Sequence, residues 1–166
     1  MVYREQEYTT LHDEMQLTLI NGLLKEGHKV HTEVVADGKS IDVISFKKTS
    51  NDPELFIYEI KSTIRSHGDT IRQINNYKHI IERLLHNDYY MLQKTSKNLK
   101  SYIYEMQGLP KSKIKITYIL ATNKNSMPDE YLLAYQNEGI EVFYMPSFTS
   151  LLNNYQTNLT KFANAV

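Results

Sequence analysis

Apolar residues recur with a helical period at the start of the chain and with a strand period soon afterwards. A first helix is expected from the caps offered by Thr9 and Thr10 to about Gly27, with its main apolar row at Leu11, Met15, Leu19 and Leu23. Residues 29–36, 40–47 and 55–62 are rich in β-branched and alternating apolar residues, which predicts three strands. Asp37-Gly38 separates the first two strands and is typical of a two-residue hairpin, since both positions tolerate positive φ.

The remainder of the chain alternates helical and strand patterns. Gly68-Asp69 predicts the start of a second helix, with Asp69 as its cap, and a third helical stretch is expected from Asp88 to Met106, ended by Gly108 and Pro110. Residues 113–122 and 140–145 predict two strands, with a helix between them over 128–139 and a closing helix from Ser147 to about Phe162.

This order of elements predicts an α/β fold with a mixed β-sheet flanked by helices. The hairpin makes the first strands antiparallel, and the helical crossovers make the later strands parallel. The length of 166 residues fits a single domain spanning 1–166, within which residues 88–112 form a helical, lysine-rich insertion.

Composition narrows the picture only at a few points. The chain contains no cysteine, which excludes disulfides and thiolate zinc sites, and it shows neither an apolar signal core nor a run of membrane-spanning length, so we expect a cytoplasmic protein. The formal net charge is zero, but the charges are unevenly distributed. The segment from residue 94 to 115 has a single acid, Glu105, and six lysines: Lys94, Lys97, Lys100, Lys111, Lys113 and Lys115. Such a segment can be a cationic contact surface, although a solvated lysine face explains it more simply.

The strands carry the candidate chemistry. Asp42 lies in the apolar second strand, and Glu59 and Lys61 lie two residues apart in the third, so that both project from one face. Charged residues in apolar strands are costly to bury unless something uses them. Two neighbouring carboxylates repel each other, and either a shared proton or a divalent cation between them resolves this conflict. Carboxylate oxygens suit Mg²⁺, with Mn²⁺ as the alternative, and a cation beside a lysine can promote phosphodiester hydrolysis.

This arrangement resembles the PD-(D/E)xK nuclease superfamily, which includes restriction endonucleases and Holliday-junction resolvases. Its motif places Asp on the second strand of a meander and Glu-x-Lys on the third, as in Asp42 and Glu59-Ile60-Lys61. The resemblance covers about residues 10–122, and Ile41, rather than Pro, precedes Asp42. It implies a restriction-endonuclease-like core of the form αβββαβ, here followed by a C-terminal αβα extension.

The resemblance also implies roles for individual residues. Asp42, Glu59 and the Ile60 carbonyl would bind the metal, and Lys61 would position the attacking water. Glu14 on the first helix would support the metal or its waters, although a surface acid near a helix start needs no such role. Gln73 and Tyr77 match a Gln-x-x-x-Tyr pattern of several branches, in which the Gln orients the lysine or contacts the nucleic-acid backbone.

The sequence thus predicts a metal-dependent endonuclease acting on DNA. Further contacts with nucleic acid are expected at Arg65, Tyr77, Lys94, Lys97 and Lys100. The alternative is a catalytically inactive module with the nuclease fold that binds nucleic acid or a partner protein. A homodimer or a targeting partner is also expected, because one small domain seldom cuts both strands alone.

Overall fold

The fold is a five-stranded mixed sheet between two layers of helices. The computed structural model describes residues 2–49 and 52–145, with side chains over 11–48 and 52–145. Its elements are α1 (Val2–Lys25), β1 (Lys29–Ala36), β2 (Lys39–Thr49), β3 (Asp52–Lys61), α2 (His67–Leu85), α3 (Tyr89–Gln93), α4 (Lys97–Gln107), β4 (Lys115–Thr122), α5 (Asp129–Asn137) and β5 (Ile140–Tyr144), with short 3₁₀ turns at Lys111–Lys113 and Lys124–Ser126. The predicted α/β class and mixed sheet are confirmed, whereas the predicted helix at 147–162 lies outside the described residues.

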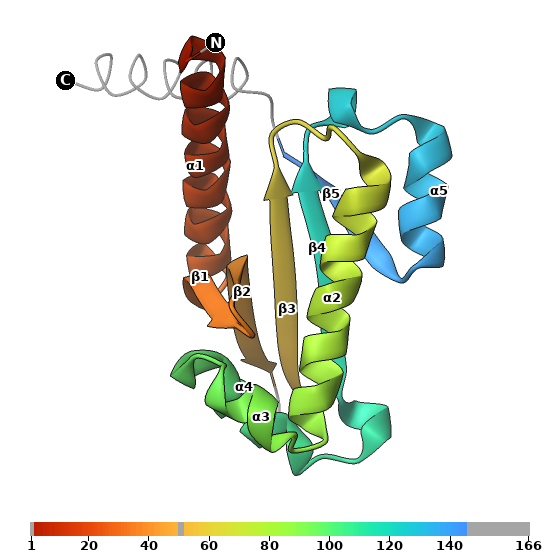
Figure 1. Cartoon of the computed structure of the whole chain (residues 1–166). Helices are drawn as coiled ribbons and strands as arrows, with labels where there is room; N and C mark the ends of the chain where they lie inside the picture. Colours follow the sequence, from red (N-terminus) through yellow and green to blue (C-terminus); the bar gives the residue numbers. More distant parts are fainter. Residues whose placement is uncertain (1, 50–51, 146–166) are drawn as a thin grey trace, which may run out of the picture.

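The strands stand in the sheet in their order along the chain, β1-β2-β3-β4-β5. β1, β2 and β3 form an antiparallel meander, and β4 and β5 are added in parallel after helical crossovers (Figure 1). β3 is therefore the central strand, and its side chains from Ile57 to Ile60 are all buried. Such a strand is covered by helices on both faces, as expected where parallel strands join a sheet.

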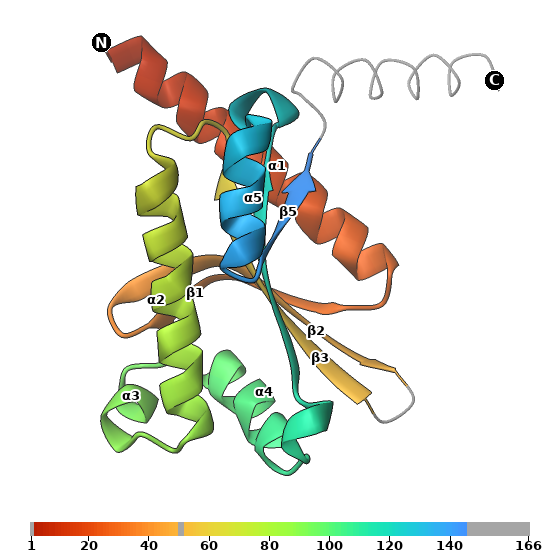
Figure 2. The same ribbon diagram turned by 90° about the vertical axis from the view of Figure 1, so that its right-hand side faces the viewer.

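The two helical layers are unequal. α1 covers one face through Met15, Leu19 and Leu23, which pack on residues of β2, β3 and β4. α2 and α4 cover the other face together with α3, and α5 extends this layer over β4 and β5 (Figure 2). Each helix thus buries one apolar stripe against the sheet. No helix within 2–49 and 52–145 is long and apolar enough to cross a membrane.

Three predicted boundaries were wrong. α1 begins at Val2, so Thr9 and Thr10 lie inside the helix instead of capping it. Ser66, not Asp69, caps α2, because its hydroxyl accepts the Asp69 amide hydrogen. The helix expected from Asp88 to Met106 is two helices, α3 and α4, separated by Thr95, which forms a backbone bridge with the end of β1.

Candidate active site

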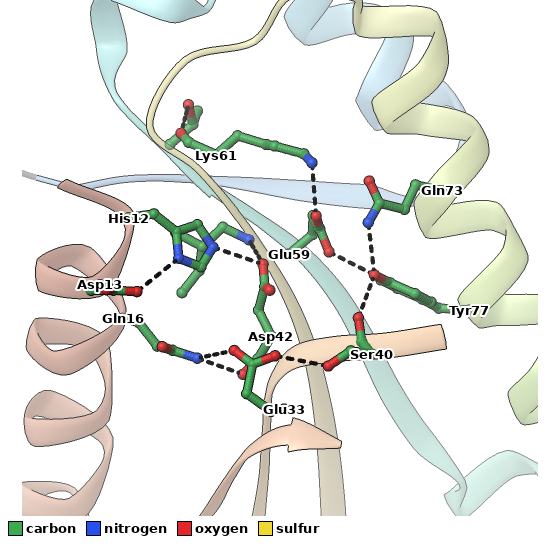
Figure 3. A network of polar contacts seen from close by, with 12 residues as sticks. His12, Asp13, Gln16, Glu33, Ser40, Asp42, Glu59, Lys61, Gln73 and Tyr77 are labelled. Atoms are coloured by element: carbon green, nitrogen blue, oxygen red, sulfur yellow. Dashed lines mark hydrogen bonds and ion pairs between the residues drawn. The ribbon is translucent and has the colours of Figure 1, made fainter. Parts of the chain in front are cut away.

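Asp42, Glu59 and Lys61 come together where β2 and β3 separate. The paired register begins at Val43 and Tyr58, so Asp42 and Glu59 occupy the next opposed positions, where pairing stops. There the Asp42 carboxylate accepts the backbone N–H of Ile60 at 2.8 Å and takes the place of a strand carbonyl (Figure 3). The opening between the two strands therefore holds both acids at one end of the central strand.

The strands change face at this point, and the change sets the direction of Asp42. Ile41 and Ile44 both lie in the core beneath α2, whereas Val43 lies beneath α1, so regular alternation is lost at Asp42. Glu33, opposite Asp42 on β1, has φ +49° and interrupts the paired register. A positive φ at a non-glycine residue costs about 1–3 kcal/mol and persists only where surrounding contacts enforce it. Here the enforcing contacts are hydrogen bonds that the Glu33 carboxylate accepts from Gln16 and Ser40, at 3.1 and 2.8 Å.

Glu59 is the most buried acid of the site, with 3% of its surface exposed. One carboxylate oxygen lies 3.0 Å from the Lys61 ammonium, and the other accepts the hydroxyl hydrogen of Tyr77 at 2.7 Å. Burial and then the charge of Asp42 raise the pKa of Glu59, although Lys61 and Tyr77 act in the opposite direction. A further positive charge would therefore favour the form in which both carboxylates are ionised.

Gln73 and Tyr77 form a relay from α2 to Glu59. The Gln73 amide donates to the Tyr77 hydroxyl at 3.0 Å, and Tyr77 donates to Glu59. Tyr77 is 1% exposed, so its ring is not accessible to the nucleic acid that the sequence led us to expect there. Gln73 contacts Tyr77 rather than Lys61, which makes both residues positioning groups for Glu59.

α1 supplies His12 and Gln16 to the site. The His12 ring nitrogen Nε2 lies 3.4 Å from an Asp42 carboxylate oxygen, and Gln16 donates to the Asp42 carbonyl at 2.9 Å. The hydrogen bond with Asp42 raises the pKa of His12, although burial opposes this effect. Glu14 is two residues from both His12 and Gln16 along α1, so its side chain points about 200° away from theirs around the helix axis. Within the described residues its side chain makes no hydrogen bond or ion pair with the site, so the structure does not bring Glu14 to Asp42 and Glu59.

His12 and Gln16 were missed by the sequence analysis. Their spacing of four residues places them on one side of α1 beside the buried Met15, which is a recognisable signal. A polar pair flanking an apolar helical row is common on protein surfaces, however. Only the packing of α1 against β2 shows that this pair faces Asp42.

A cleft of about 320 Å³ opens beside Lys61 and Gln73. The loop 62–66 and the first turns of α2 form its walls, and Arg65 is exposed at this position. Asp69, the acid among the lining residues, is paired with Arg72 at 2.8 Å. Lys61 therefore connects the cleft to Glu59, with which it is paired, and Arg65 adds a second cationic side chain to the lining.

Lys94, Lys97 and Lys100 do not share one helix. Lys94 follows α3, and its ammonium lies 4.4 Å from the ring centroid of Tyr90. Lys97 and Lys100 belong to α4 and line a separate groove that Asn87, just after α2, also borders. Figure 1 shows α4 at the end of α2 that lies opposite the tip of β3. The predicted lysine face is therefore divided, because Lys94 lies at the cap of α3 and only Lys97 and Lys100 lie on α4.

The donor set of the site fits a hard divalent cation. Asp42 and Glu59 supply carboxylate oxygens, and Ile60 lies in the backbone beside them. Among the described residues, no group of three His, Cys, Asp or Glu side chains could hold a metal, so Glu14 does not complete a protein cage. Mg²⁺ commonly keeps several waters and binds through one or two carboxylates together with substrate phosphates. No family model, curated protein or solved structure matches the chain.

Proposed function

We propose that this protein is a divalent-metal-dependent endonuclease that hydrolyses phosphodiester bonds in DNA. The observation that supports it best is the opening between β2 and β3, where Asp42 and the buried Glu59 occupy opposed positions and Lys61 lies 3.0 Å from Glu59. A mixed sheet of five strands flanked by helices is compatible with a restriction-endonuclease-like core. The proposal includes membership of the PD-(D/E)xK superfamily.

In this proposal Asp42 and Glu59 bind Mg²⁺ or Mn²⁺, with the Ile60 carbonyl as a third oxygen donor. The cation would lower the pKa of a bound water and neutralise charge on the phosphate. The hydrogen bond from the Ile60 amide holds Asp42 in place, and the relay from Gln73 through Tyr77 holds Glu59. Neither carboxylate then has to reorganise when substrate binds.

Lys61 has the role closest to the reacting atoms. Its side chain is 31% exposed and lines the cleft, whereas the side chain of Glu59 that it contacts is 3% exposed, so Lys61 lies between Glu59 and the cleft. In hydrolysis the oxygen of water forms a bond to phosphorus, one P–O ester bond breaks, and the departing oxygen gains a proton. Lys61 orients the attacking water and stabilises the negative charge that develops on the phosphate oxygens.

The test is a cleavage panel of labelled linear duplex, single strand, four-way junction and RNA, each with Mg²⁺, Mn²⁺ or EDTA. We expect cleavage of DNA with metal and none with EDTA. Asp42→Asn, which keeps the shape of the side chain, should reduce the rate by at least about 100-fold, the scale for loss of one electrostatic group. Glu82→Gln, a change at an exposed acid of α2, is the matched control and should leave the rate unchanged.

Two outcomes would contradict the proposal. Cleavage that survives in Asp42→Asn would place the activity elsewhere or in a contaminant. Binding of DNA without cleavage by the wild type, in either metal, would favour the alternative of an inactive nuclease-fold module.

A further inference from the structure

The outer face of α4 carries lysine and tyrosine side chains that take no part in the candidate active site. The inner face of this helix is buried through Leu99, Tyr102, Ile103 and Met106. The outer face borders a groove of about 370 Å³, lined among others by Lys97, Lys100, Ser101 and Tyr104. The half-buried Leu92 provides the apolar lining, while Ile103, beneath the groove, is 1% exposed. The groove therefore combines an apolar part with cationic and aromatic side chains.

Tyr104 is unusually exposed for an aromatic residue. Its exposed fraction is 79%, and the neighbouring helix α3 exposes Tyr89 and Tyr90 by 75% and 51%. An exposed ring beside apolar groove residues gains free energy when a flat apolar group covers it. The aromatic residues thus mark this end of the molecule as a contact surface.

The charges around the groove favour an anionic partner. Lys97 and Lys100 form no ion pair with any residue in the described part of the chain. Glu105 is the only acid in the segment from Lys94 to Lys115, which carries six lysines. An anion at the groove would therefore meet two uncompensated cations and little repulsion.

We propose that this groove binds single-stranded nucleic acid. A base stacks on the ring of Tyr104 over the apolar part of the groove, and flanking phosphates contact Lys97 and Lys100. In a duplex the bases are already stacked and paired, so that only its phosphates could use the site. The inference rests on the proposed function, since it assigns the substrate of the nuclease a single-stranded part.

The groove and the candidate active site would contact different parts of one strand. Gln73, beside the active site, and Asn87, at the groove, are 14 positions apart along or just beyond α2. At 1.5 Å per residue this corresponds to roughly 20 Å. With about 3.4 Å per nucleotide in a stacked strand, roughly six nucleotides span that distance.

The test is binding of a fluorescein-labelled 15-nucleotide oligothymidine, followed by anisotropy in EDTA at several salt concentrations. Lys97→Gln/Lys100→Gln should reduce the slope of log affinity against log salt by about 1.4, since each phosphate contact on a single strand contributes about 0.7. Lys25→Gln/Lys29→Gln, which changes two exposed lysines elsewhere, is the matched control and should leave the slope unchanged.

The tyrosine provides a second, independent readout. Tyr104→Ala should weaken binding by at least about fivefold, the lower end for loss of one base-stacking contact. Tyr104→Phe should stay within about twofold of the wild type, because the phenyl ring offers the same stacking face. Because Tyr104 is exposed, we expect α4 to remain folded in both variants, and far-ultraviolet circular dichroism verifies this.

Binding in EDTA and cleavage in Mn²⁺ separate this inference from the proposed function. If the wild type binds the oligonucleotide and the variants weaken binding as expected, but no DNA is cleaved, the inference that the groove binds a single strand is supported and the nuclease proposal fails. If the wild type cleaves DNA but the groove variants bind like the wild type, the groove inference is overturned. An acidic protein segment would then be the better candidate partner for this surface.

Discussion

Tyr77→Phe tests how the fold prepares Glu59 for a cation. The substitution removes one hydroxyl and keeps the buried ring, so it creates little cavity. Glu59 loses the hydrogen bond that it accepts from Tyr77 at 2.7 Å. Because that bond stabilises the ionised carboxylate, its loss raises the pKa of Glu59 further above the ordinary range.

The size of the effect follows from the kind of bond that is lost. A hydrogen bond to a charged group contributes about 1.5–3 kcal/mol, which corresponds to about a 10- to 100-fold loss in affinity for a cation that requires the ionised form. Calorimetric titration with Mn²⁺ at pH 6.5, 7.5 and 9 measures this affinity. We expect the loss to be largest at the lowest of these pH values and to shrink as pH rises, because a higher pH favours the ionised carboxylate with or without the hydroxyl.

Tyr102→Phe is the matched control, because it removes a buried hydroxyl that bonds to His31 at 2.6 Å, outside the site. It should lower the free energy of unfolding by about 1 kcal/mol without changing Mn²⁺ affinity. An Mn²⁺ affinity of Tyr77→Phe equal to that of the wild type at every pH would show that the Tyr77 hydroxyl does not prepare Glu59 for the cation. An equal loss in Tyr102→Phe would show that the effect is general destabilisation.

Three further predictions concern the site and its support. In EDTA, the free energy of unfolding of the wild type should fall relative to that of Glu59→Gln as pH rises, because the raised pKa of Glu59 makes its ionisation unfavourable in the folded state. Urea denaturation of both proteins at pH 5 and pH 8 measures the difference, and an equal change in the two proteins would contradict the prediction. His12→Asn should increase Mn²⁺ affinity at pH 6 and change this affinity little at pH 8.5, because the raised pKa keeps the His12 ring positively charged beside Asp42 in acid. Calorimetric titration at both pH values is the check, and a decrease in Mn²⁺ affinity at both would show that His12 supports the metal. Met15→Ala, at a fully buried residue of α1, should lower the free energy of unfolding by about 2–5 kcal/mol in urea, and a loss under 1 kcal/mol would mean that α1 is not held to the sheet through this residue.

The order of the elements was predictable because it depends on local patterns. The β-branched strand residues and the Asp37-Gly38 turn specify the meander, and the apolar period of 71–85 specifies α2. The first and last residues of the helices were harder to predict, because more than one nearby residue could act as the cap. Ser66 and Asp69 are both good helix caps, and only the backbone path after β3 favours Ser66.

The site was predictable where it follows from strand alternation and not where it depends on packing. Glu59 and Lys61 share a face as their spacing indicates, and their side chains are in contact. The direction of Asp42 depends instead on the change of face opposite Glu33, which needs long-range contacts with α1. The family resemblance pointed to Glu14 on the first helix, whereas the residue of α1 whose ring lies beside Asp42 is His12, a contact that depends on how α1 packs on β2.

The proposed function requires that Asp42 and Glu59 together hold one divalent cation. The most direct measurement is an anomalous difference map from crystals of the protein grown with Mn²⁺. We expect one peak within about 2.0–2.3 Å of an oxygen of each carboxylate, and no such peak in Asp42→Asn. A map at saturating Mn²⁺ with no peak between the two carboxylates, or with its only peak on other residues, would contradict a metal site at Asp42 and Glu59.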